Sequence, residues 1–327
     1  MANEPQSVDG IPVTAEQIGY AAQEMIACGK CAKANPPNRL NCLYCGDLLE
    51  LPTEIAAGIR FKPSEIEDWE PGVNIVVVEG LSDSDPQAIA SAVLFDTELV
   101  TSLSTIEPPL PLFRVRPEEA EEVEGRLSRL GLGIERVEDR ALDLAKPPTR
   151  LKGFEFGESS MSFVPFNSNE NSVVDISDVV LVVVGSITTT TAESKLKKKR
   201  KETKEFDEHM SSSEHALIDI HTSGHDVGYR ILQHGFDFSC LGERKSLLAG
   251  ENVKVLLEVL REMLPDAVFD RSYASKSAVL DHVWPRTVAN TSKGIERNWF
   301  GVQRGLGTMT SNEEQFTRYS RMRRKLL

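Results

Sequence analysis

The sequence predicts a multidomain α+β protein. It combines a small cysteine-rich module, a small α/β sandwich, and a β-rich, barrel-like domain closed by a helix. Three observations predict this fold class. Four of the five cysteines fall within 18 residues, strand and helix patterns alternate over residues 53–146, and β-branched runs dominate residues 147–270. At roughly 100–200 residues per domain, a chain of 327 residues is expected to form two or three domains.

Composition limits the classes of protein to which the chain can belong. Hydrophobic residues make up 40% and charged residues 27%, so a sizeable core is expected and general disorder is excluded. The longest apolar run, 179–184, is far shorter than the roughly 20 residues that a membrane helix needs. The first residues lack the pattern of a signal peptide, so we expect a cytoplasmic protein. The net charge of −13 argues against a general nucleic-acid binder.

Two Cys-x-x-Cys pairs form the clearest motif. Cys28-Gly-Lys-Cys31 and Cys42-Leu-Tyr-Cys45 are separated by ten residues, which is the spacing of a four-thiolate zinc site. In each pair a tight turn brings both sulfurs to one ion, and Gly29 and Gly46 supply backbone freedom near the turns. All four positions are filled by protein, so a structural zinc is predicted. Iron held as in rubredoxin is the alternative metal.

Around these cysteines, residues 28–48 resemble the short bacterial zinc ribbons. The shared features are the first Cys-x-x-Cys, a linker containing Asn35-Pro-Pro, and a second pair that continues as Cys45-Gly-Asp-Leu. The resemblance implies the fold and the metal over residues 23–52. It does not imply an activity, because such ribbons serve as binding or spacing modules in many unrelated proteins. Residues 1–22 are expected to be a flexible N-terminus.

Residues 53–146 are acidic and alternate between strand and helix patterns. Strands are predicted at 74–78, 110–115 and 134–137. One helix is predicted to begin after Asp83, Ser84 or Asp85, with Pro86 in its first turn. A second, at 117–130, carries an apolar stripe and closes at Gly131. Its early glutamates are interpreted as a solvated first turn rather than a catalytic cluster.

Residues 147–270 are richer in strand patterns. Strands are predicted at 151–156, 161–166, 179–184, 216–221 and 229–233, with extended chain continuing through the threonines to 191. An amphipathic helix at 251–264 ends at Pro265. Antiparallel strands followed by one closing helix are similar to the pleckstrin-homology-like domains. This resemblance covers residues 149–270 and rests on element order alone.

Two features of this region could carry function. Six basic side chains over residues 195–201 are placed on a loop, where they could meet anionic groups or keep a strand edge soluble. Five histidines lie within residues 209–234. A second metal site there stays open, but their spacing matches no metal motif, and a loop enriched in polar residues is the interpretation that we favour. Cys240 is interpreted as a small buried hydrophobe.

Residues 271–327 are predicted to be a flexible basic tail, with 11 basic and 4 acidic side chains. A short basic helix is expected near its end, at 316–327. Trp284, Trp299 and Phe300 indicate docking onto a surface. The surface could belong to the chain's own acidic region, to another protein or to a nucleic acid.

The sequence contains no nucleophile elbow, zinc-protease motif, phosphate-binding glycine loop or kinase signature. We therefore expect a non-enzymatic interaction or adaptor protein that binds a protein partner. The alternative is a nucleic-acid-associated regulatory protein that uses the ribbon and the basic tail. The sequence does not identify the partner, and a homo-oligomer stays open.

Overall fold

The computed structural model describes residues 7–8, 11–12, 25–37, 39, 42–47, 49–50, 61–64, 66–168, 170–198, 204–225, 227–298 and 301–327. For 193–198, 204–209, 291–298 and 301–307 it describes strand pairing but not side-chain environment. The fold is a mixed α+β structure with a curled sheet and a cysteine cluster near the N-terminus, as the sequence predicts. Its separation into independent domains stays a prediction. No helix in the described part of the chain is long and apolar enough to cross a membrane.

The acidic α/β region forms a three-stranded antiparallel sheet. The strands are β5 (Val73–Glu79), β6 (Leu110–Val115) and β7 (Gly133–Glu138), in the order β6-β5-β7. The expected helices are α2 (Pro86–Ala92), capped by the side chain of Asp85, and α4 (Ala120–Ser128), preceded by one 3-10 turn. Two short helices, α3 (Thr97–Leu103) and α5 (Asp139–Leu142), were not predicted.

A nine-stranded sheet makes up most of the remaining chain. Its order is β10-β9-β8-β13-β12-β11-β16-β15, with β14 (Val268–Asp270) beside β11. The strands at one end are β8 (Thr149–Phe156), β9 (Ser160–Pro165), β10 (Ser172–Asp175) and β13 (Tyr229–Leu232). Helix α6 (Ala249–Met263) buries its apolar face against them, as expected of a closing helix. The sequence predicts antiparallel strands throughout, and this prediction is wrong at two places. Strand β13 pairs with β8, and β14 pairs with β11, in parallel.

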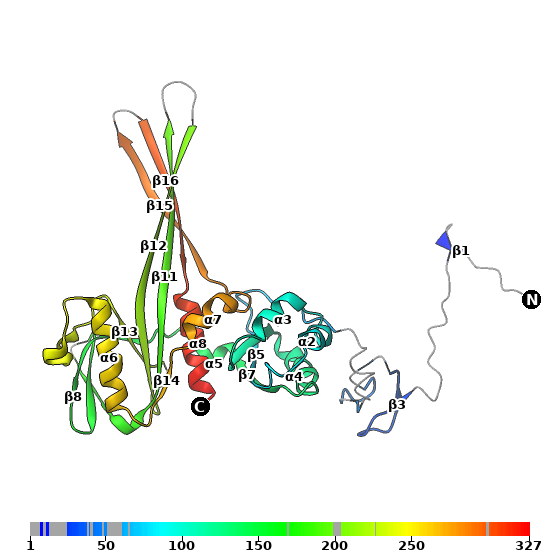
Figure 1. The fold of residues 1–327 in the computed structure, drawn as a ribbon. Helices are drawn as coiled ribbons and strands as arrows, with labels where there is room; N and C mark the ends of the chain where they lie inside the picture. The colour runs from blue at the N-terminus through cyan, green and yellow to red at the C-terminus, as the bar shows by residue number, and fades with distance from the viewer. Residues whose placement is uncertain are drawn as a thin grey trace, which may run out of the picture.

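Four long strands extend the sheet away from the helices (Figure 1). They are β11 (Val179–Lys198), β12 (Lys204–Thr222), β15 (Thr287–Asn298) and β16 (Gly301–Ser311). We call residues 187–198, 204–216, 287–298 and 301–311 the β projection. The basic run was expected on a loop, but residues 195–198 lie within β11, paired with β12, because the hairpin extends further than its apolar pattern. Residues 199–201 lie outside the described part.

The segment predicted to be a flexible tail is built into the fold. Residues 271–327 form α7 (Tyr273–Leu280), the β15–β16 hairpin and α8 (Glu313–Lys325). Phe316 and Tyr319 of α8 are fully buried, and Trp284 is 1% exposed. The Trp284 indole N–H donates to Asn74 Oδ1 of β5 at 2.9 Å. Trp284 is therefore docked on the chain's own acidic region, while Trp299 and Phe300 lie outside the described residues.

Two hydrophobic cores share strand β11. Leu181 and Val183 belong to the first core, with the α/β sheet, α7 and α8. Val182 belongs to the second, with α6 and the β8–β13 strands. Side chains alternate between the two faces of a strand, so one strand buried on both faces joins both cores. The first core consequently crosses the boundary predicted near residue 146.

Candidate metal centre

The two Cys-x-x-Cys turns have the same backbone hydrogen bonds. In the first, the Ala32 N–H donates to Cys28 O at 2.8 Å, and the Cys28 N–H donates to Lys33 O at 3.0 Å. In the second, Gly46 donates to Cys42 O at 3.0 Å, and Cys42 donates to Asp47 O at 2.7 Å. Each turn therefore folds its second cysteine back toward the first. This repeated geometry is the physical reason for the Cys-x-x-Cys spacing.

The fourth residue after each leading cysteine lies in the left-handed region of backbone space. Gly46 has φ +74° and Ala32 has φ +58°. Glycine adopts this conformation without steric cost, whereas alanine does not. Gly46 was expected to supply backbone freedom and does so. Gly29 has no such φ, and the equivalent position of the first turn is held by Ala32 instead.

The four sulfurs converge on one point. The Sγ atoms of Cys28, Cys31, Cys42 and Cys45 all lie within 4.8 Å of one another. Two pairs are closer, with Cys28–Cys45 at 3.6 Å and Cys31–Cys42 at 3.4 Å. A tetrahedral zinc with Zn–S bonds of about 2.3 Å places its sulfurs about 3.8 Å apart. The donor set therefore fits a four-coordinate metal ion, consistent with a zinc-ribbon-like site.

Asn35 ties the two turns together, a role that the sequence analysis missed. It lies in β4 (Ala34–Asn35), which pairs with β3 (Ile26–Ala27), and its side chain is fully buried. Its Nδ2 donates to Lys33 O at 2.8 Å and to Cys42 Sγ at 3.4 Å, and its Oδ1 accepts from the Leu43 N–H at 2.8 Å. An asparagine beside a proline pair reads as a turn residue, so no local pattern reveals this contact.

Backbone donors favour a thiolate at Cys42. Burial raises the pKa of its thiol, but hydrogen bonds from the Tyr44 and Cys45 N–H groups and from Asn35 outweigh burial and lower that pKa to about 6. The Asp47 N–H lowers the pKa of Cys45, but burial and the three neighbouring thiols prevail and raise it to about 12. Thiolates are the form that binds metal, and a bound cation would favour ionisation of all four.

One side of the module is open to solvent. Cys28 and Cys42 are buried, whereas Cys45 is exposed. Leu43 and Tyr44, between the second pair of cysteines, are 51% and 58% exposed. The Lys33 ammonium lies 4.4 Å from the centre of the Tyr44 ring. The metal turn thus presents an apolar and aromatic surface at its tip.

The histidines expected as a possible second site do not gather. His221 is fully buried, with Nε2 2.7 Å from Ser320 Oγ. His215 and His234 stack with ring centres 4.0 Å apart, while His225 contacts Tyr229. Within the described residues, the four cysteines are the sole group of three or more side chains placed to share a metal. The side chain of His209 lies outside that description.

Cys240 fits its expected inert role. It packs partly buried against the second core. Burial raises the pKa of its thiol to about 11, so it is a neutral thiol at physiological pH.

Comparison with known proteins assigns neither a family nor a function to the chain. No protein-family model, curated protein or solved structure matches the chain. The case for a function therefore rests on the geometry of the chain itself.

Proposed function

We propose that the chain is a non-enzymatic interaction protein, in which a structural zinc shapes an N-terminal module that docks onto a protein partner. The observation that carries the proposal is the closed donor set. Four protein sulfurs lie within 4.8 Å of one another, which leaves no coordination position for a substrate. A closed site serves folding rather than chemistry, and among the described residues the buried core of this module consists of Cys28, Cys42 and Leu49.

Surface geometry supports a binding role. The exposed Leu43–Tyr44 tip sits on the turn that the metal holds, so zinc binding would fix the conformation of the docking surface. Aromatic residues on rigid turns are frequent anchors of protein interfaces. Elsewhere in the chain, the β projection adds a second extended surface.

The nucleic-acid alternative receives less support from the C-terminal segment. It uses the ribbon and the basic tail, and two arginines of helix α8 have partners within the chain. Arg321 donates to the carbonyls of Leu142, Asp143 and Lys146, and Arg323 binds Asp270 at 2.5 Å. Both side chains are at most 16% exposed, so they are poorly placed to meet phosphates.

Two measurements test the proposal. Elemental analysis of protein from the native host should show about one zinc per chain, and stoichiometric iron would contradict the metal assignment. A photo-crosslinking residue at position 44 of the full chain should then yield a discrete adduct with one protein in native cells. The adduct should disappear when Cys31 is replaced by serine, and the same crosslinker at Val173, which is 70% exposed, is the control. Failure to form any adduct specific to position 44 would contradict the docking role.

A further inference from the structure

Two adjoining hollows form one groove along the α/β sheet. Their volumes are about 500 and 390 Å³, and both are lined by Asp68, Arg114, Val283 and Pro285. One wall, which we call the wall segment, is formed by residues 62–64, 66 and 68, and the other is the connection from α7 to β15. We call this the seam groove. Its total volume is within the range of sites that hold a ligand.

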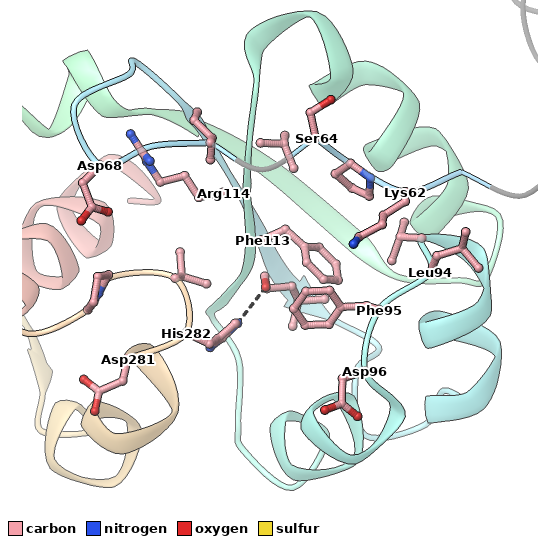
Figure 2. Close-up of a pocket in the computed structure, with 17 residues that line it drawn as sticks. Lys62, Ser64, Asp68, Leu94, Phe95, Asp96, Phe113, Arg114, Asp281 and His282 are labelled. Carbon is pink, nitrogen blue, oxygen red and sulfur yellow. Dashed lines mark hydrogen bonds between the residues drawn. The ribbon is translucent and has the colours of Figure 1, made fainter.

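The first hollow has an aromatic floor fixed by its packing (Figure 2). Phe95 and Phe113 meet edge to face with centres 4.6 Å apart, and the His282 ring lies 6.3 Å from Phe95. His282 Nε2 is 2.8 Å from the Leu112 carbonyl, which holds the imidazole against edge strand β6. A preformed apolar floor costs little to organise when a side chain enters.

The rim of the hollow carries exposed apolar side chains. Leu94 is 41% exposed and is held at φ +47°, a conformation that leucine rarely adopts. Strain of this kind persists where the surrounding structure imposes it, and it is common at binding sites. Trp69, which follows Asp68 directly in the chain, is 80% exposed. Indoles left in solvent beside a groove are typical anchors for a partner.

The second hollow ends at an open strand edge. Thr287 and Val288 line it, and they are the first residues of β15, the last strand of the nine-stranded sheet. Val288 is 61% exposed. An edge strand offers unpaired backbone groups to an extended chain, and the groove would receive alternate side chains of that chain.

The charges in the groove are not fully compensated. Arg114 pairs with Asp139, Arg286 with Asp281, and Arg318 with Glu314. Among the described residues, Asp68 and Asp96 form no ion pair, and the sole cation lining the groove without one is Lys62. Unpaired carboxylates outnumber unpaired cations, in a chain of net charge −13. A basic partner is therefore favoured.

We infer that the seam groove binds an extended peptide segment of a protein partner. An apolar side chain of the segment sits over Phe95 and Phe113, basic residues flank it, and its backbone pairs with the edge of β15. This inference rests on the proposed function, because it specifies the chemistry of the partner. It concerns a surface separate from the Leu43–Tyr44 tip.

The test is selection of a random 12-residue phage-displayed peptide library on the immobilised full chain. Enriched peptides, once synthesised, should carry alternating apolar residues and Lys or Arg. Fluorescence anisotropy should show binding at least tenfold weaker to L94D and V288D. Aspartate tolerates the left-handed conformation at position 94, so that variant should keep its fold. The matched control is L247D, at a leucine that is fully exposed elsewhere on the molecule.

The outcomes separate the two proposals. Binding weakened by L94D and V288D, unchanged in L247D, and weakened further by D68K and by salt supports the inference. Lack of enrichment, enrichment of acidic peptides, or equal losses for L94D and L247D would overturn it. If an adduct at position 44 still forms in native cells, the interaction function stands and only the seam groove fails. If that adduct is absent as well, both proposals fail.

Discussion

Ala32 and Gly46 occupy equivalent positions in two turns with the same hydrogen bonds, yet only one of them is a glycine. A left-handed alanine costs roughly 1 kcal/mol relative to its preferred conformations. In the described part of the chain, no atom lies within 4 Å of the position that a Cβ at Gly46 would occupy, so a change there chiefly tests backbone conformation. The pair therefore isolates how much of the metal affinity depends on turn geometry.

We expect A32G to tighten metal binding and G46A to weaken it, each by up to about fivefold. The reason is that metal binding and folding of so small a module are one equilibrium, in which about 1.4 kcal/mol corresponds to a factor of ten. Competition for zinc against a chromophoric chelator measures both variants. The essential result is that the two substitutions change the zinc affinity in opposite directions. Equal affinities for the two variants and the parent chain would show that the turns are not strained.

Asn35 provides a second test at the residue scale. N35L removes the donor to Cys42 Sγ and leaves the Leu43 N–H without its acceptor. Loss of groups that orient metal ligands typically lowers metal affinity by 10- to 100-fold. The same chelator competition should show a loss of that size, while E50Q, at an exposed side chain of the same module, should match the parent. An unchanged affinity for N35L would mean that Asn35 only fills space.

At the scale of elements, the sequence predicts local features well and the C-terminal segment poorly. The cysteine turns and the strands near residues 74, 110 and 134 depend on neighbours in sequence, so spacing and alternation reveal them. Helix α8 reads as a solvated basic helix because it is rich in charge. It is buried because its polar groups find distant partners, such as Arg230 reaching Thr317 at 3.0 Å across 87 positions. A hydropathy pattern registers that a residue is charged, but it does not show whether a distant partner allows that residue to be buried.

The β15–β16 hairpin was missed for a related reason. Its glycines suggest flexibility, but they lie in strands that pair with each other, and β16 also pairs with β11. The seam groove could not be predicted from the sequence either. Its walls come from residues near 65, 95, 113 and 283, which only the fold brings together.

Helix α8 is expected to be essential to the first core. Phe316 is fully buried, meets Tyr273 edge to face at 4.9 Å, and lies under Gly185 of β11. Truncation of a buried phenylalanine usually costs about 3–5 kcal/mol, so F316A should lower the free energy of unfolding in urea by that amount. F166A, at a half-exposed ring, should cost much less. If F316A lowers the free energy of unfolding by less than about 1 kcal/mol, residues 313–327 are not part of the core and behave as a tail.

Gly185 offers a complementary test of the same contact. A Cβ there would lie 2.4 Å from the Phe316 ring and 2.9 Å from Tyr273, so G185A should overpack the site. Overpacking typically costs 1–3 kcal/mol. Combining G185A with F316L should recover part of that loss, because the smaller side chain makes room. Strictly additive losses in the double variant would show that the two residues do not touch in solution.

At the scale of the whole molecule, the two cores meet where β11, β12 and α8 lie against one another. His221 of β12 is fully buried at this junction, and its Nε2 lies 2.7 Å from Ser320 Oγ of α8. Its Nδ1 has no hydrogen-bond partner among the residues that the structure describes. The charged groups around the imidazole are Asp219 and Arg230 from the sheet and Arg321 and Arg324 from α8. Burial, with the three arginines, outweighs the carboxylate and lowers the pKa of His221 to about 4.

This burial makes stability depend on pH. The folded chain keeps His221 neutral, whereas the unfolded chain binds a proton below about pH 6.5. The stabilisation is therefore complete above pH 6.5 and is lost as pH falls through about 4. The difference of about 2.5 between the two pKa values corresponds to roughly 3.5 kcal/mol, since each pKa unit is worth about 1.4 kcal/mol. Unfolding in urea, followed by the near-ultraviolet circular dichroism of buried Trp284, should show this decline between pH 7 and 4.5.

The variant H221N separates this effect from other titrations. Asparagine can still hydrogen-bond to Ser320 but carries no proton-binding group, so its stability should fall less steeply over the same pH range. Because acid also releases metal from thiolates, the comparison is made in a C31S background, which removes metal loss from both chains. A lower stability of H221N at pH 7 does not affect the result, since the quantity compared is the slope of the free energy of unfolding against pH. Equal slopes for the two chains would mean that His221 is protonated in the folded state or that the junction opens before it titrates.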